Sequence, residues 1–167
     1  VMNTITIQTP GTTASLKQGY AYIERDAADA GLGGFAVFRQ SIPGKPDSEA
    51  VVPIVNEFDD RFVLLFDNTN GFSTGVAIAN SDSQTEAIPI TIRDEDGQVL
   101  TTKTIMMNGY AHIAGSLPAM WPETAGKKGS IEFRVNGWGA GVLGLRFHPS
   151  GAFTSFHVIS NAMWILN

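Results

Sequence analysis

The chain has 167 residues, of which 43% are hydrophobic and 16% are charged, and its formal net charge is -5. This composition excludes a disordered chain and is typical of one globular domain with a sizeable core. Cysteine is absent, which excludes disulfides, thiolate metal sites and cysteine nucleophiles. The acidic balance argues against nucleic acid as a partner, because phosphates attract basic surfaces.

Neither a membrane span nor a signal peptide is visible in the sequence. No apolar run reaches the roughly 18 residues that cross a bilayer. Val1 precedes Met2, so we expect a mature or excised segment of a longer protein.

The first third of the chain contains short runs of alternating polarity, which predict strands. They cover residues 3–9, 19–25, 35–40 and 49–54. Pro53 cannot donate a hydrogen bond to a neighbouring strand, so the run at 49–54 is expected at a sheet edge.

Two longer segments have the pattern of a β-hairpin. Residues 61–80 consist of an apolar run, the pair Asn70-Gly71 and a second alternating run. Asparagine and glycine accept the positive φ of a tight hairpin turn, so we expect both runs to pair with each other. Residues 88–105 repeat the pattern, with a turn at 94–97.

Four more strands are expected in the last third, at 109–115, 130–135, 141–147 and 152–159. Period-two alternation predicts that three sets of side chains face inward, namely Ile88, Ile90 and Ile92, then Ile131, Phe133 and Val135, then Leu143, Leu145 and Phe147. Ser116 and Pro118 favour one helical turn near 116–121, which Pro122 would end. The predicted fold is all-β, a two-sheet antiparallel β-sandwich with at most one short helical turn, in a single domain over residues 1–167.

No catalytic or metal-binding pattern stands out. The three histidines, His112, His148 and His157, have no partner at ligand spacing, and no G-x-S-x-G motif is present. The acidic run 94–96 lacks the spacing of a calcium loop and suits a hairpin turn. We therefore expect a protein that is not an enzyme, with no catalytic residue, no metal and no cofactor.

The aromatic residues are the strongest candidates for ligand binding. Trp138 lies between Gly137 and Gly139, and Trp121 precedes a proline, so either indole could be exposed or could pack on the core. Tyr20 and Tyr22 are expected to share one face of a strand. Possible polar partners lie on the predicted hairpin tip: Asp67, Asn68 and Asn70.

A resemblance accompanies these patterns. Seven segments carry it: GYAYIERD, GGFAVFRQ, EAVVPI, FDNTNGFSTGVAIAN, IRDEDGQVL, PETAGKKGSIEFR and GLRFHPSGAFTSF. In this order they resemble a poorly characterised domain that occurs at the ends of large secreted and surface proteins of soil bacteria. The resemblance covers most of residues 19–158 and implies an extracellular β-sandwich, without implying an activity.

Two functions are consistent with the sequence. The first is a non-catalytic recognition module, extracellular or on the cell surface, that binds a polysaccharide or another surface polymer through the aromatic residues. The alternative is a structural or adhesive subunit that self-assembles by strand exchange or edge pairing. The terminal segments 3–9 and 162–166 are the candidates for that exchange.

Overall fold

The computed structural model describes residues 4–11, 18–23, 33–54, 59–135 and 139–160. The strands in these ranges are β1 (Phe35–Gln40), β2 (Ser48–Pro53), β3 (Arg61–Asp67), β4 (Ser73–Asn80), β5 (Glu86–Asp94), β6 (Val99–Met107), β7 (His112–Ser116), β8 (Lys128–Arg134), β9 (Ala140–Phe147), β10 (Phe153–Phe156) and β11 (Val158–Ser160). Two short helical turns, α1 (Leu117–Met120) and η1 (Pro122–Thr124), lie between β7 and β8. None of the helices in this part of the chain is long and apolar enough to cross a membrane.

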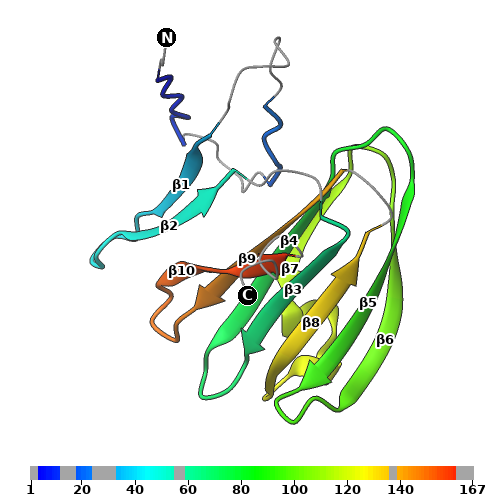
Figure 1. The fold of residues 1–167 in the computed structure, drawn as a ribbon. Helices are drawn as coiled ribbons and strands as arrows, with labels where there is room; N and C mark the ends of the chain where they lie inside the picture. The colour runs from blue at the N-terminus through cyan, green and yellow to red at the C-terminus, as the bar shows by residue number, and fades with distance from the viewer. Residues whose placement is uncertain (1–3, 12–17, 24–32, 55–58, 136–138, 161–167) are drawn as a thin grey trace, which may run out of the picture.

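Two antiparallel sheets form the body of the molecule (Figure 1). One has the strand order β11-β3-β8-β5-β6, and the other has the order β10-β9-β4-β7. A third, two-stranded sheet consists of β1 and β2, and β2 lies beside β10. The predicted all-β sandwich is therefore confirmed, with a small hairpin added to it.

The core lies between the two larger sheets. The inward sets predicted for β5 and β8 are buried: Ile88, Ile90, Ile92, Ile131, Phe133 and Val135. Phe62, Leu64 and Phe66 of β3 add a third row, because alternate residues of a strand point to the same face. Val76 and Ile78 of β4 close the core from the opposite sheet.

The predicted hairpin at 61–80 is wrong in its pairing, although its turn is right. Asn70 and Gly71 have φ values of 52° and 79°, and the amide of Phe72 donates to the carbonyl of Thr69 at 2.9 Å, as in a tight hairpin turn. However, β3 pairs with β8 and β11, whereas β4 pairs with β9 and β7. The segment 68–72 is therefore an arch that carries the chain from one sheet to the other.

The second predicted hairpin is confirmed. β5 pairs with β6 in antiparallel register, with a shift between Ile92 and Arg93. The carboxylate of Asp94 accepts bonds from the amides of Asp96 and Gln98, which closes the turn.

The strand predicted at 152–159 is two strands in different sheets. β10 pairs with β9, and after His157 the strand β11 pairs with β3. One short stretch of the chain thus contributes a strand to each layer of the sandwich.

The inward face predicted for β9 is also wrong. Ala140, Val142 and Gly144 face the core. The residues predicted to face inward, Leu143, Leu145 and Phe147, are only half-buried. A side chain at Gly144 would overlap the tip of Leu64 on the opposite sheet. From Ala140 to Leu145, β9 carries small or apolar residues on both faces, so the alternation does not distinguish them.

The N-terminal expectations are met in part. β1 and β2 match the strands predicted at 35–40 and 49–54, and among the described strands β2 pairs only with β1. The described parts of the predicted strands 3–9 and 19–25 contain no strand, so those two predictions are wrong there. The tail 162–166 lies outside the described residues.

The helical turn expected near 116–121 is present as α1. Ser116 occupies the capping position, but its side chain makes no capping hydrogen bond. Pro122 does not end the helical structure, because it begins the 3-10 turn η1.

Candidate functional site

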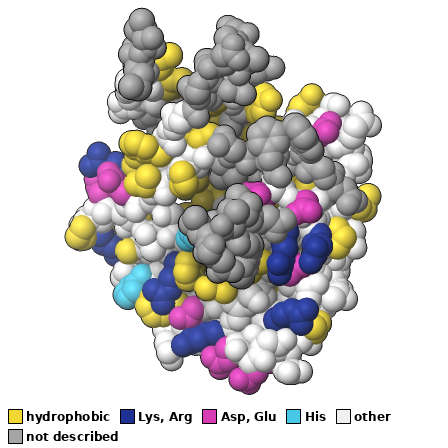
Figure 2. Space-filling model, in the orientation of Figure 1, with side chains coloured by type: hydrophobic (Ala, Val, Ile, Leu, Met, Phe, Trp, Pro, Cys, Tyr) yellow, Lys and Arg dark blue, Asp and Glu magenta, His cyan; other side chains and the backbone are white. Residues whose placement is uncertain are grey.

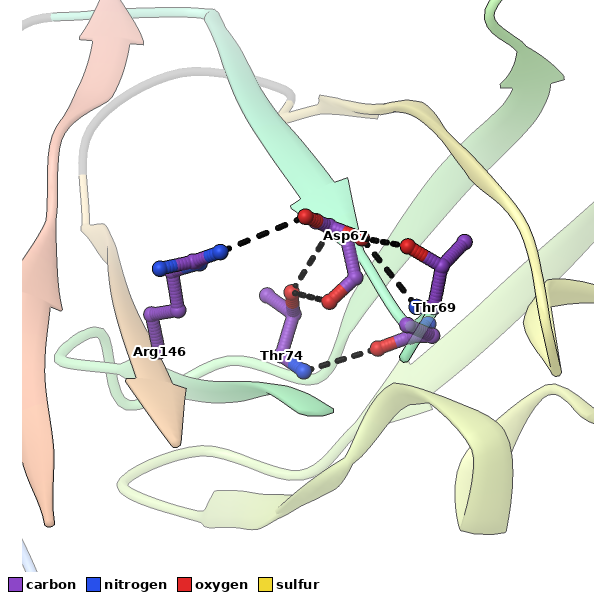
Figure 3. A network of polar contacts seen from close by, with 5 residues as sticks. Asp67, Thr69, Thr74 and Arg146 are labelled. Atoms are coloured by element: carbon purple, nitrogen blue, oxygen red, sulfur yellow. Dashed lines mark hydrogen bonds and ion pairs between the residues drawn. The ribbon is translucent and has the colours of Figure 1, made fainter. Parts of the chain in front are cut away.

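The arch 68–72 is built on a polar network around Asp67, at the end of β3 (Figure 3). The Asp67 carboxylate accepts bonds from the hydroxyl and the amide of Thr69, at 2.7 and 3.1 Å. Arg146 of β9 reaches the same carboxylate at 3.3 Å, and its guanidinium lies 3.8 Å above the ring of Phe72. The hydroxyl of Thr69, followed by its amide and by Arg146, holds the pKa of Asp67 below its usual value against partial desolvation.

Asn68 holds the arch to the core. Its side-chain oxygen accepts a bond from the amide of Thr74 at 2.7 Å, and its side-chain nitrogen donates to the carbonyl of Thr124 at 3.1 Å. All three residues are buried. Asn68 is therefore a structural residue whose hydrogen bonds are used inside the protein, and it is not accessible to a ligand.

Asn70 borders a polar hollow at this end of the sandwich. The hollow measures about 420 Å³ and has eight lining residues: Thr69, Asn70, Asp94, Glu95, Asp96, Gly126, Lys127 and Lys128. The end of β5 and the turn that follows it supply the acids, and the loop before β8 together with the first residue of β8 supplies the lysines. No aromatic side chain lines this hollow, so it lacks the flat apolar surface that the sequence led us to expect beside Asn70.

The exposed tyrosines lie elsewhere. The hydroxyl of Tyr20 is 3.4 Å from the carbonyl oxygen of Tyr110 and 3.5 Å from that of Asn80, the last residue of β4. The ring of Tyr20 also meets that of His112 edge-on, with centroids 6.2 Å apart. Tyr20, Tyr22 and Tyr110 are 39%, 57% and 63% exposed. We call Tyr20, Tyr22, Tyr110 and the adjoining loop 82–84 the tyrosine end.

The loop 82–84 gives the tyrosine end its polar groups. The carbonyl of Asp82 accepts the amide of Tyr110 at 2.9 Å, which fixes Tyr110 at a φ of 58°. The exposed Asp82 carboxylate accepts the amide of Gln84 and the hydroxyl of Ser83. These two bonds, the one from Gln84 first, hold the pKa of Asp82 below its usual value. The loop thus brings an exposed carboxylate and the exposed Gln84 side chain to a segment whose backbone is bonded to that of Tyr110.

The two groups of candidate residues belong to opposite ends of the sandwich. Asn70 lies in the arch that precedes β4, whereas Tyr20 contacts Asn80 at the far end of that strand. Eight residues of strand span roughly 26 Å at about 3.3 Å per residue. The expectation that Asp67, Asn68 and Asn70 would assist Tyr20 in one site is therefore wrong.

The two tryptophan candidates have different outcomes. Trp121 is buried in the core, with its ring centroid 6.4 Å from that of Phe133, so it is not an exposed platform. Trp138 lies outside the described residues. Sequence reasoning missed Tyr110, although the turn-like pair Asn108-Gly109 before it is a signal for an aromatic side chain on a loop.

Comparisons with known proteins identified no relative of this chain. The chain matches no family model, no curated protein and no solved structure. Among the described residues, no group of three or more acidic or histidine side chains could hold a metal ion.

Proposed function

We propose that this protein is a non-catalytic recognition module that binds a polysaccharide or another surface polymer through the tyrosine end. The observation that carries the proposal is the contact of the Tyr20 hydroxyl with the backbone carbonyl of Tyr110, which brings two exposed tyrosines to one end of the sandwich. The resemblance of residues 19–158 to a domain of secreted proteins supports an extracellular or cell-surface location.

Exposed tyrosines are suited to this ligand class. The C–H faces of a sugar ring are apolar and cover an aromatic ring, while the tyrosine hydroxyl stays in contact with water. A cluster of exposed aromatic side chains places apolar surface in contact with water. Exposed apolar patches of this kind commonly mark binding sites.

The neighbouring polar groups provide the second half of sugar recognition. Sugar hydroxyls donate to carboxylates and accept from amides. The Asp82 carboxylate and the Gln84 side chain are exposed on the loop whose backbone is bonded to that of Tyr110, and the hydrogen bonds of Asp82 within this loop fix its position before any ligand arrives. A prearranged site of this kind loses less conformational entropy on binding.

Affinity electrophoresis on a panel of soluble polysaccharides tests the proposal. At least one polymer should retard the wild-type chain. Tyr110→Ala should lower the apparent affinity calculated from the retardation by about tenfold or more, because a lost stacking contact worth about 1.4 kcal/mol corresponds to a factor of about ten in affinity. Asp82→Asn should also weaken binding, whereas Asp96→Asn, the matched change in the polar hollow, should not.

Two results would refute the proposal. The first is the absence of retardation by any polymer. The second is equal retardation of the wild-type chain and of Tyr110→Ala, provided that circular dichroism shows both to be folded.

A further inference from the structure

The β1–β2 hairpin has two different faces. Its register pairs Ala36 with Val52 and Phe38 with Ala50 on one face. Ala50 is buried, and β2 lies beside β10, so the β2 half of this face covers the edge of the four-stranded sheet, whereas Phe38 on β1 is 47% exposed. Lys45, in the hairpin loop, secures the arrangement by donating to the carbonyl of Ser150 at 2.6 Å.

The opposite face, which we call the outer face, is apolar and open. It pairs Phe35 with Pro53 and Val37 with Val51. Phe35 is 69% exposed, and Val37 and Val51 are each 50% exposed. Figure 2 shows hydrophobic side chains gathered over this hairpin, beside a cluster of basic and acidic side chains.

The charges on the outer face form a single row at one end. Arg39 pairs in register with Glu49, and the two side chains approach to 3.7 Å. Arg39 also donates to Asp47 at 2.8 Å, which raises the pKa of Arg39. A hydrogen bond from Ser41, followed by the one from Arg39, lowers the pKa of Asp47. Beyond this row, Phe35, Val37, Val51 and Pro53 carry no charge.

This pattern is complementary to itself. Consider two outer faces stacked about a two-fold axis that runs parallel to the strands between them. Such an axis keeps each residue at its height along the strand and exchanges β1 with β2, so every residue meets its own register partner from the other copy. Val37 then lies over Val51, Phe35 lies over Pro53, and Arg39 lies over Glu49.

We propose that the outer face of the β1–β2 hairpin is a self-association surface, on which a second copy of this chain packs face to face about that two-fold axis. Two-stranded sheets are marginal in water unless a face is covered, and apolar sheet faces pack about 10 Å apart. In the dimer both apolar rows are removed from water, while each Arg39 gains a third carboxylate, that of Glu49 from the second copy, beside its own Asp47 and Glu49. The inference does not depend on polysaccharide binding, because the tyrosine end is a separate surface.

Light scattering coupled to size-exclusion chromatography, from micromolar to millimolar concentration, tests the inference on the full chain. The mass should rise toward twice the 17.9 kDa chain mass as concentration increases. Val37→Lys should hold the mass at that of one chain, whereas Val99→Lys, at a residue that is 51% exposed on β6, should leave the dimer intact. A monomer at every concentration, or equal behaviour of the two lysine variants, would overturn the inference.

A charge exchange tests the register and does not rely on the apolar residues. In Arg39→Glu, residue 39 of each copy faces Glu49 of the other copy with the same charge, so the dimer should dissociate. The double variant Arg39→Glu with Glu49→Arg restores opposite charges across the interface and should restore the dimer. Failure of the double variant to restore the dimer would reject the two-fold arrangement. Deletion of residues 1–9 should leave the dimer in place, and loss of the dimer on deletion would assign association to strand exchange by the N-terminal segment instead.

Discussion

Replacing Asn68 by alanine removes the side chain that holds the arch 68–72 to the core. The buried amide of Thr74 loses its partner, while the carbonyl of Thr124 keeps its bond from the amide of Lys127 at 3.2 Å. One unsatisfied buried amide costs about 1–3 kcal/mol. We therefore expect Asn68→Ala to lower the free energy of unfolding by about 1–3 kcal/mol. For a chain of this length that corresponds to a fall in Tm of about 2–12 °C.

Urea denaturation followed by circular dichroism measures this loss directly. Asn108→Ala is the matched control, because Asn108 is exposed and only its backbone carbonyl is engaged, so its free energy of unfolding should stay within about 0.5 kcal/mol of wild type. If Asn68→Ala were as stable as Asn108→Ala, the structural role of Asn68 would be refuted and a role in ligand binding would need to be considered again.

Three further predictions concern stability. Gly129→Ala should prevent folding, because a Cβ there would overlap the backbone oxygen of Arg93 on β5, whereas Gly141→Ala meets no atom within 4 Å and should fold normally; yields of soluble protein compare the two. Partial burial opposes ionisation of Glu132, but hydrogen bonds from two arginines outweigh it and hold its pKa below the usual value. Below about pH 4.3 the unfolded chain then binds more protons than the folded chain, so the free energy of unfolding decreases as the pH falls. Urea titrations across this pH range should show a smaller decrease for Glu132→Gln than for the wild-type chain. Trp121→Ala should cost about 3–5 kcal/mol in the same urea assay, since a buried aromatic ring is removed; a cost below about 0.5 kcal/mol would instead indicate an exposed side chain.

Local turn chemistry was readable from the sequence, but the sheet to which each strand belongs was not. Asn70-Gly71 adopts the positive φ values that its residues favour. Nothing in those residues specifies whether the following strand pairs with β3 or crosses to the other sheet, because that choice depends on β8 and β9, more than 50 residues further along the chain. A tight turn therefore predicts a reversal of the chain, and the pairing remains a separate question.

Strand faces were predictable only where one face is polar. Ile88, Ile90 and Ile92 alternate with more polar residues, and their burial followed the pattern. β9 has apolar residues on both faces, and its core-facing residue Gly144 has no side chain because Leu64 fills that space. The glycine was the informative residue in this strand, and hydrophobicity alone assigned it to the wrong face.

The candidate site depended on contacts between distant segments. The sequence identified Tyr20 and Tyr22, but Tyr110, which lies 90 residues from Tyr20, joins them only in the folded chain. The polar partners chosen from the sequence were those of the most visible turn, and that turn lies at the other end of β4. Asp82 has the same residue type as Asp67, and only its position beside Tyr110 distinguishes it.

The most direct test of the account is a nuclear magnetic resonance titration of the labelled chain with an oligosaccharide of the polymer that retards it. The account predicts that the amide shifts that change first and most belong to Tyr20, Tyr22, Tyr110 and the loop 82–84. Changes centred instead on Asn70, Asp94–Asp96 and Lys127–Lys128, or no changes at any amide, would contradict recognition by the tyrosine end.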